Sequence, residues 1–199
     1  MKQWQKVTRG CMLGGILLVI AGCATVDEVY FLDTRTKANV FIAPQDRGQE
    51  GVVRKIAVLP FKAPTELAGN AMADVFLTEI MRTGRYELVE RTRMGQVLSE
   101  AELALTGLSA AKATEVGSMM GADAVVIGTV DEYATQKHRR RDYPVVAMSA
   151  RLIECKSGQV IWSVDLAKRA KDDRVTLAEH ARTVTHEMVA ALYQRWHDQ

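Results

Sequence analysis

An almost continuous apolar run at residues 122–133 constrains the fold of this chain more than any other feature. It contains Val125-Val126-Ile127 and then Gly128-Thr129-Val130, with little of the polar alternation that a half-exposed strand shows. Runs of this kind are typical of strands that are buried on both faces. We therefore expect residues 122–133 to form a central strand of a sheet that carries the fold.

Two further strands follow this run along the chain. Residues 145–154 and 159–166 alternate apolar and polar side chains, and Cys155-Lys156-Ser157-Gly158 between them has turn chemistry. Three successive strands joined in this way predict an antiparallel meander.

The segments before and after the meander alternate between strand and helix patterns. We expect strands at 55–61 and 86–90, and helices at 65–84, 94–101, 109–121 and 175–196, with Thr65 and Ser109 opening two of them and Gly84 and Gly121 following their ends. The predicted order is β-α-β-α-α-β-β-β-α. This order predicts an α/β fold, a sandwich of flanking helices on a mixed β-sheet.

The N-terminus carries a different kind of signal. Lys2, Lys6 and Arg9 precede an apolar segment at residues 11–22, which is too short for a membrane-spanning helix of roughly 20 residues. A charged start followed by a short apolar run is typical of an export signal.

The end of that run resembles the cleavage box of bacterial lipoproteins: Ile20, Ala21 and Gly22, followed by Cys23. The resemblance implies that residues 1–22 are a signal peptide and that Cys23 becomes the lipidated first residue, with a palmitate-type acyl chain. Ala24 in place of Asp implies the outer membrane, with the domain lipid-anchored on the periplasmic face. The alternative is a plain secretory signal that ends beside a chance cysteine.

Removal of the signal also changes the charge of the chain. Loss of its three cations takes the formal charge from +2 to −1, so no basic domain is left for binding nucleic acid. Cys155 is then the only unmodified cysteine, which excludes an intrachain disulfide.

We expect residues 23–52 to be the lipidated N-terminus and a tether, and residues 53–199 to be the folded periplasmic domain. Val40-Phe41-Ile42 is the apolar part of the tether. Two interpretations stay open: the segment is a flexible spacer, or it packs on its own domain or on a neighbour.

Four blocks of the folded part resemble the CsgG-type lipoproteins of curli assembly and transport, whose domain architecture LpoB-type and PelC-type outer-membrane lipoproteins share. The blocks are residues 56–61, 84–91, 121–130 and 157–162. The resemblance implies a CsgG-like α/β domain in a non-catalytic scaffold or assembly component of an export or secretion system. It also implies a homo-oligomer or an envelope protein complex, without nucleic acid or small-molecule substrate. The alternative is an LpoB-like regulator of a peptidoglycan synthase.

One departure from the family narrows this expectation. The channel-forming relatives insert two β-hairpins per subunit into the membrane, one after the first meander strand and one after the third. Here those gaps, residues 134–144 and 167–174, are short and rich in charge. A membrane strand needs about 9–11 residues with alternate apolar side chains. We therefore expect no transmembrane hairpins in this chain.

No set of residues predicts catalysis, a metal site or a cofactor other than the lipid on Cys23. His186-Glu187 begins like a zinc-protease helix motif, but Ala190 stands where the second histidine is needed. His180 lies six positions before His186, and we expect both to be solvated helix residues. Glu90 and Asp123 end strand and helix segments without an evident partner, and Cys155 has no resolving cysteine.

The run His138, Arg139, Arg140 and Arg141 is the remaining candidate. It is either a solvated hairpin tip or an electrostatic contact site for anionic headgroups, polysaccharide or an acidic partner.

Overall fold

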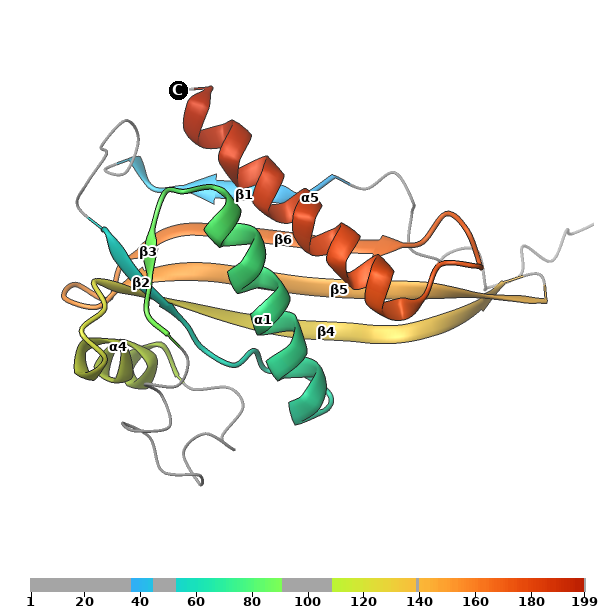
Figure 1. The fold of residues 1–199 in the computed structure, drawn as a ribbon, viewed down its shortest axis with the longest axis horizontal. Helices are drawn as coiled ribbons and strands as arrows, with labels where there is room; N and C mark the ends of the chain where they lie inside the picture. Colours follow the sequence, from blue (N-terminus) through green and yellow to red (C-terminus); the bar gives the residue numbers. More distant parts are fainter. Residues whose placement is uncertain (1–36, 45–52, 91–108, 139, 199) are drawn as a thin grey trace, which may run out of the picture. The chain divides into compact units, whose positions relative to one another are not determined.

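The computed structural model describes residues 37–44, 53–90, 109–138 and 140–198. They form a six-stranded sheet in the order β1-β6-β5-β4-β2-β3 and three helices (Figure 1). The strands are β1 (Asn39–Ile42), β2 (Lys55–Val58), β3 (Glu87–Leu88), β4 (Ala124–His138), β5 (Arg141–Glu154) and β6 (Val160–Arg169), and the helices are α1 (Glu66–Arg82), α4 (Ala110–Met119) and α5 (Leu177–His197). The predicted α/β class is confirmed, and the predicted elements occur in the expected order with β1 added before them; the helix expected at 94–101 lies outside the described residues.

The apolar run of the sequence is the centre of this sheet. β4 pairs in parallel with β2, where Ala57 lies opposite Val125, and antiparallel with β5, where Val126 lies opposite Leu152. β5 then pairs antiparallel with β6, so the predicted meander on a mixed sheet is confirmed. Ala124, Val125 and Val126 have no exposed surface, as expected of a strand that is covered on both faces.

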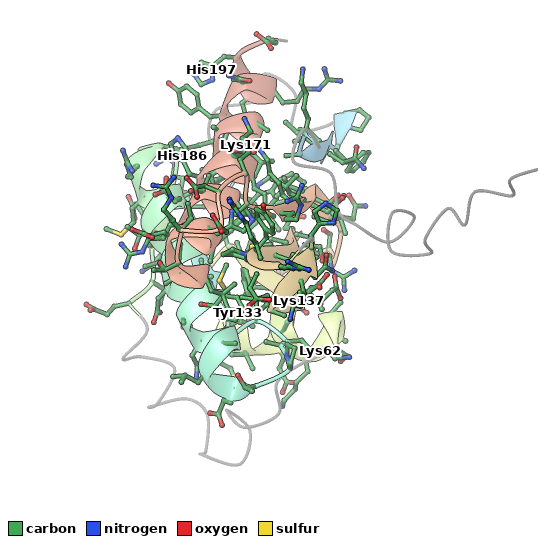
Figure 2. All side chains as sticks on the ribbon, turned by 90° about the vertical axis from the view of Figure 1, so that its right-hand side faces the viewer. Lys62, Tyr133, Lys137, Lys171, His186 and His197 are labelled. Carbon is green, nitrogen blue, oxygen red and sulfur yellow. The ribbon has the colours of Figure 1, made fainter. Side chains whose placement is uncertain are left out.

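Helices α1 and α5 cover one face of the sheet. Figure 2 shows both helices on the same side of the strands. The core between these helices and the sheet contains a cluster of aromatic rings. The Phe76 ring lies 5.6 Å from that of Phe61 and 6.3 Å from that of Trp162. The Trp162 indole N–H donates to the Tyr86 hydroxyl over 3.1 Å, so this fully buried side chain has its polar atom satisfied.

Helix α4 covers the other face, but only where β4 begins. Val116 of α4 and Met120 just after its end form a second apolar cluster with Val125 of β4 and Ile153 of β5. Gly117 brings the helix close to the strand, because a Cβ there would lie 2.2 Å from Val125 Cγ1. The rest of this face has no helix above it among the described residues.

The predicted helix ends are observed. The Thr65 and Ser109 hydroxyls accept hydrogen bonds from backbone N–H groups in the first turns of α1 and α4. Thr176, which the sequence did not single out, opens α5 with a capping box to Glu179. These caps set the helix starts that position α1, α4 and α5 on the sheet.

Strand β1 comes from the segment that the sequence assigned to the tether. It pairs antiparallel with β6, with Val40 opposite Val164 and Ile42 opposite Trp162. Ile42 is buried in the main core. Of the two interpretations left open for Val40-Phe41-Ile42, the structure therefore shows packing on its own domain.

Candidate functional site

The largest difference from the sequence prediction is at residues 134–144, which were expected to be a gap between strands. β4 continues to His138 and β5 already begins at Arg141, with Gln136 opposite Tyr143 and Lys137 opposite Asp142. We call residues 131–138 of β4 together with 141–147 of β5 the arm. Figure 1 shows its two strands running together past α1 to their common turn. The physical reason is cross-strand pairing, which keeps polar residues in strand geometry without a local apolar pattern.

The turn of the arm contains the predicted basic run. Arg140 has φ of 71°, a left-handed conformation that a tight hairpin turn requires. The His138 ring lies 6.4 Å from that of Tyr143 in an edge arrangement. Arg141 Nε lies 3.6 Å from Asp173 Oδ2. The structure therefore places His138, Arg140 and Arg141 at one turn, and Arg139 lies outside the described residues.

The second predicted gap, residues 167–174, lies beside this turn. β6 continues to Arg169, whose guanidinium lies 4.7 Å from the centre of the Tyr143 ring. The next residue, Ala170, donates its N–H to Pro144 O over 2.8 Å. The two segments that were compared with membrane hairpins thus meet at the same end of the sheet.

We call this region the basic end. Its exposed or half-buried charged residues come from both segments, and cations outnumber carboxylates: Lys137, Arg140, Arg141, Lys168, Arg169, Lys171 and Arg174 against Asp142, Asp172 and Asp173. Figure 2 looks onto this end, with Lys137 and Lys171 labelled. Sequence reasoning missed Tyr143 and Asp173, since only the pairing across the turn brings them to the basic run.

The cations of the basic end differ in whether they form ion pairs. Arg174 lies 3.5 Å from Asp172 Oδ1, and the backbone N–H of Arg174 is the main cause that holds the pKa of Asp172 below its usual value. Lys137, Arg140 and Lys171 form no ion pair with the part of the chain that is described. Exposed charges act over about 8 Å at physiological salt, so these three cations can attract an anionic group only at close range.

The two histidines of α5 lie in different environments, and the expectation for His180 was wrong. His180 is 3% exposed, whereas His186 is exposed and its Nδ1 lies 2.9 Å from Glu79 Oε2 of α1. The apolar face of α5 is wide enough to include position 180, one residue before the predicted stripe position Ala181. His186 remains a surface residue, as predicted, and connects the two helices.

His180 is part of a small polar cluster under the start of α5. Its Nε2–H donates to Lys168 O over 2.8 Å, and Lys168 Nζ contacts both carboxylate oxygens of Glu187 at 2.6 and 2.7 Å. Burial lowers the pKa of His180, and the nearby Lys168 charge adds to that effect, while the hydrogen bond and Glu187 oppose it. His180 is therefore held neutral more firmly than a solvated histidine.

The other candidate residues have structural roles or stay unassigned. Asp123 Oδ2 accepts the N–H groups of Arg54 and Lys55, and so fixes the start of β2. Burial raises the pKa of the Cys155 thiol, which disfavours the reactive thiolate. Glu90 is exposed. Cys23 and the lipobox residues Ile20, Ala21 and Gly22 lie outside the described residues.

Two searches of the described part of the chain were negative. Residues 37–44, 53–90, 109–138 and 140–198 contain no group of three or more His, Cys, Asp or Glu side chains arranged to hold a metal ion. Within the same ranges, none of the helices combines the length and the apolar character needed to cross a membrane.

Comparison with known proteins places these features in a family. The family model described as curli production assembly/transport component CsgG matches residues 53–187. The match includes all four blocks on which the sequence resemblance depends. No curated protein sequence matches the chain.

Several solved structures are similar to this one. The PelC dodecamer from Paraburkholderia phytofirmans is 19% identical over 79% of this chain and 96% of that chain, with a TM-score of 0.58. Lipoprotein GNA1162 from Neisseria meningitidis is 17% identical over 73% and 99%, with a TM-score of 0.54. The C-terminal domain of LpoB from Salmonella enterica is 16% identical over 62% and 87%, with a TM-score of 0.46. The likeness to the first two shows that the fold is shared.

Proposed function

The chain belongs to the CsgG family, and from that premise we propose that it is a lipoprotein of the outer membrane that faces the periplasm and serves an export or secretion system as a non-catalytic scaffold. The observation that carries the proposal is the family match over residues 53–187. The lipobox supports the membrane attachment, since acyl chains on Cys23 would hold the domain at the membrane surface.

We propose that it acts through self-association. PelC, which shares the fold, is a dodecamer. The sheet described here has two different edges, β1 and β3. Two different surfaces on one subunit are what a head-to-tail ring requires. A homo-oligomer is therefore the form in which we expect the scaffold to work.

We further propose that the chain contributes no transmembrane hairpins. The arm occupies the position of the first family hairpin, and Asp131, Glu132 and Lys137 lie along its β4 strand. A charged side chain on the lipid face at mid-membrane costs about 2–4 kcal/mol for Lys or Arg. The lipid would then be the membrane attachment, and no cofactor or catalytic group is assigned to the domain.

The short link between Cys23 and the sheet supports this function over regulation of a distant enzyme. Because β1 begins at Asn39, residues 24–38 are what remains of the tether. Fully extended, they reach about 50 Å. A regulator of LpoB type that acts across the periplasm would need a longer spacer.

Mass measurement of the full chain in mild detergent, with planar-bilayer conductance recorded alongside, tests the proposal. The expected result is a closed homo-oligomer of fixed mass that forms no channel. A Cys23→Ala variant should lose membrane attachment and keep the fold, which separates the anchor from the domain. A stable monomer would contradict the ring, and large discrete channels would contradict the absence of membrane hairpins.

A further inference from the structure

The face of the sheet without α1 and α5 carries two rows of side chains that cross the strands. In the first row, Ile127 of β4, Arg151 of β5, Ser163 of β6 and Phe41 of β1 lie opposite one another in register. In the second row, the order is Lys62, Thr129, Ser149, Asp165 and Asn39. Side chains on one face of a sheet alternate along each strand, so both rows project to the same side.

Seven members of these rows line a groove of about 410 Å³, and the two β1 residues Phe41 and Asn39 continue the rows beside it. This volume lies within the range of about 300–1,000 Å³ that small-ligand sites have. Its lining includes the hydroxyl residues Thr129, Ser149 and Ser163 together with Leu59 and Pro60. The groove is formed by strands that pair along their length, so its shape is set by the sheet.

Most polar side chains of the groove have no partner among the described residues. The side chains of Lys62 and Arg151 and the three hydroxyl groups form no hydrogen bond or ion pair with the part of the chain that is described. Asp165 Oδ1 accepts a hydrogen bond from Asn39 Nδ2 over 3.3 Å. Three hydroxyls, each a donor and an acceptor, lie beside these cations and this amide–carboxylate pair: Thr129 is opposite Lys62, Ser163 is opposite Arg151, and Ser149 is opposite Asp165.

The chemistry of these groups selects a ligand class. Lys62 and Arg151 outnumber Asp165, so the groove favours an anion, and a guanidinium binds a carboxylate with two parallel hydrogen bonds. The hydroxyls and the Asn39–Asp165 pair match a ligand that is rich in hydroxyl groups. The Phe41 ring is 50% exposed in the first row, and its negative face attracts the polarised C–H groups of a sugar ring.

We propose that this groove binds an acidic saccharide, a sugar chain that carries carboxylates. A peptide fits less well, since peptide and protein partners are anchored by buried apolar or aromatic side chains at the centre of the contact. The centre of this groove is occupied by Arg151, Ser149 and Ser163 instead. The proposal does not depend on the scaffold role, because a monomer presents the same groove.

Calorimetric titration of the full chain in mild detergent with tri-galacturonic acid tests the proposal, with maltotriose and tetra-glutamate as comparators. Tri-galacturonic acid should bind at least about tenfold more tightly than either comparator, since it alone supplies both hydroxyls and carboxylates. Binding should weaken as salt is raised, because Lys62 and Arg151 are exposed.

Variants localise the site. Arg151→Gln should weaken binding at least about tenfold, and Arg151→Lys should weaken it less, because lysine keeps the charge but not the two parallel hydrogen bonds. Lys62→Gln and Phe41→Ala should weaken it by smaller factors. Arg182→Gln, which removes an exposed cation from α5 on the other side of the sheet, should change nothing.

Absence of binding by tri-galacturonic acid would overturn the proposal. Equal loss in Arg151→Gln and Arg182→Gln would also overturn it, as a general charge effect. Tighter binding of tetra-glutamate would assign the groove to an acidic peptide instead.

Discussion

The two ends of β4 lie in one continuous strand but are stabilised in different ways. At its start, Ala124, Val125 and Val126 are fully buried between α1 on one face and α4 on the other. In the arm, none of the β4 residues 131–138 is buried. The same strand therefore passes from the apolar core to the surface, where pairing with β5 and contacts between charged side chains stabilise it. We expect stability to be concentrated at the first end and electrostatic contacts at the second.

Truncation of Trp162 should have the largest effect on the core. Its side chain is fully buried, its ring lies 6.4 Å from that of Trp196, and its N–H donates to Tyr86. Trp162→Ala should lower the free energy of unfolding by about 3–5 kcal/mol, measured by urea denaturation. Thr135→Ala, in the exposed part of the arm, is the control and should stay within about 0.5 kcal/mol. Similar losses for both variants would contradict the comparison.

Gly128 tests how tightly the middle of β4 is packed. A Cβ at this position would lie 2.7 Å from ring carbons of Phe61. Gly128→Ala should destabilise the domain by about 1–3 kcal/mol because the core has no room for an added methyl group.

Phe61→Leu provides the matching background for Gly128→Ala. When Phe61 is already leucine, Gly128→Ala should lower the free energy of unfolding by less. The double-mutant cycle should give a coupling energy of about 0.5–3 kcal/mol between the two positions. Additive losses would show that Phe61 is not what opposes the methyl group.

His180, under the start of α5, should make stability depend on pH. Burial lowers its pKa in the folded state, so the unfolded chain binds this proton more readily. Its contribution to stability is therefore complete above the unfolded value near 6.5, and it is lost as pH falls from there toward the folded pKa.

His180→Gln can still donate to Lys168 O, and we expect a flatter dependence of the unfolding free energy on pH between 5 and 8. His186→Gln is the control, because His186 is exposed and contacts Glu79 rather than the Lys168–Glu187 pair. An unchanged slope in His180→Gln would exclude this histidine as the source.

The Arg141–Asp173 contact should have the smallest effect. Arg141 is 65% exposed at its side chain, and the two charged groups lie 3.6 Å apart. Asp173→Asn should lower the free energy of unfolding by less than about 0.5 kcal/mol, and high salt should remove the difference. A loss above about 1 kcal/mol would show that the basic end contributes to stability as well as to charge.

Those elements whose pattern is local were predictable from sequence. The helix at 66–82 has apolar side chains at helical spacing and a Thr65 cap, and the central strand has an apolar run. Both signals lie within the element itself. The CsgG-like class followed from the same core and turn residues.

The features that sequence missed depend on partners outside the element itself. β1 has only four residues and is stabilised by pairing with β6, more than a hundred residues later. The polar β4 half of the arm needs its pairing with β5, and burial of His180 needs the Lys168 carbonyl. The two cross-sheet rows of the groove likewise exist only once β1, β4, β5 and β6 are in register.

Strand β1 also has a mechanical consequence. It is held to β6 by four residue pairs, whereas β4 and β5 are paired along almost their whole length. If lipid on Cys23 fixes the chain to a membrane, any pull on the domain loads β1 first. A fully extended chain from Cys23 to the start of β2 would reach about 100 Å, against about 50 Å to the start of β1. Under such a pull, the edge strand β1 would detach from β6 before the core of the domain unfolds.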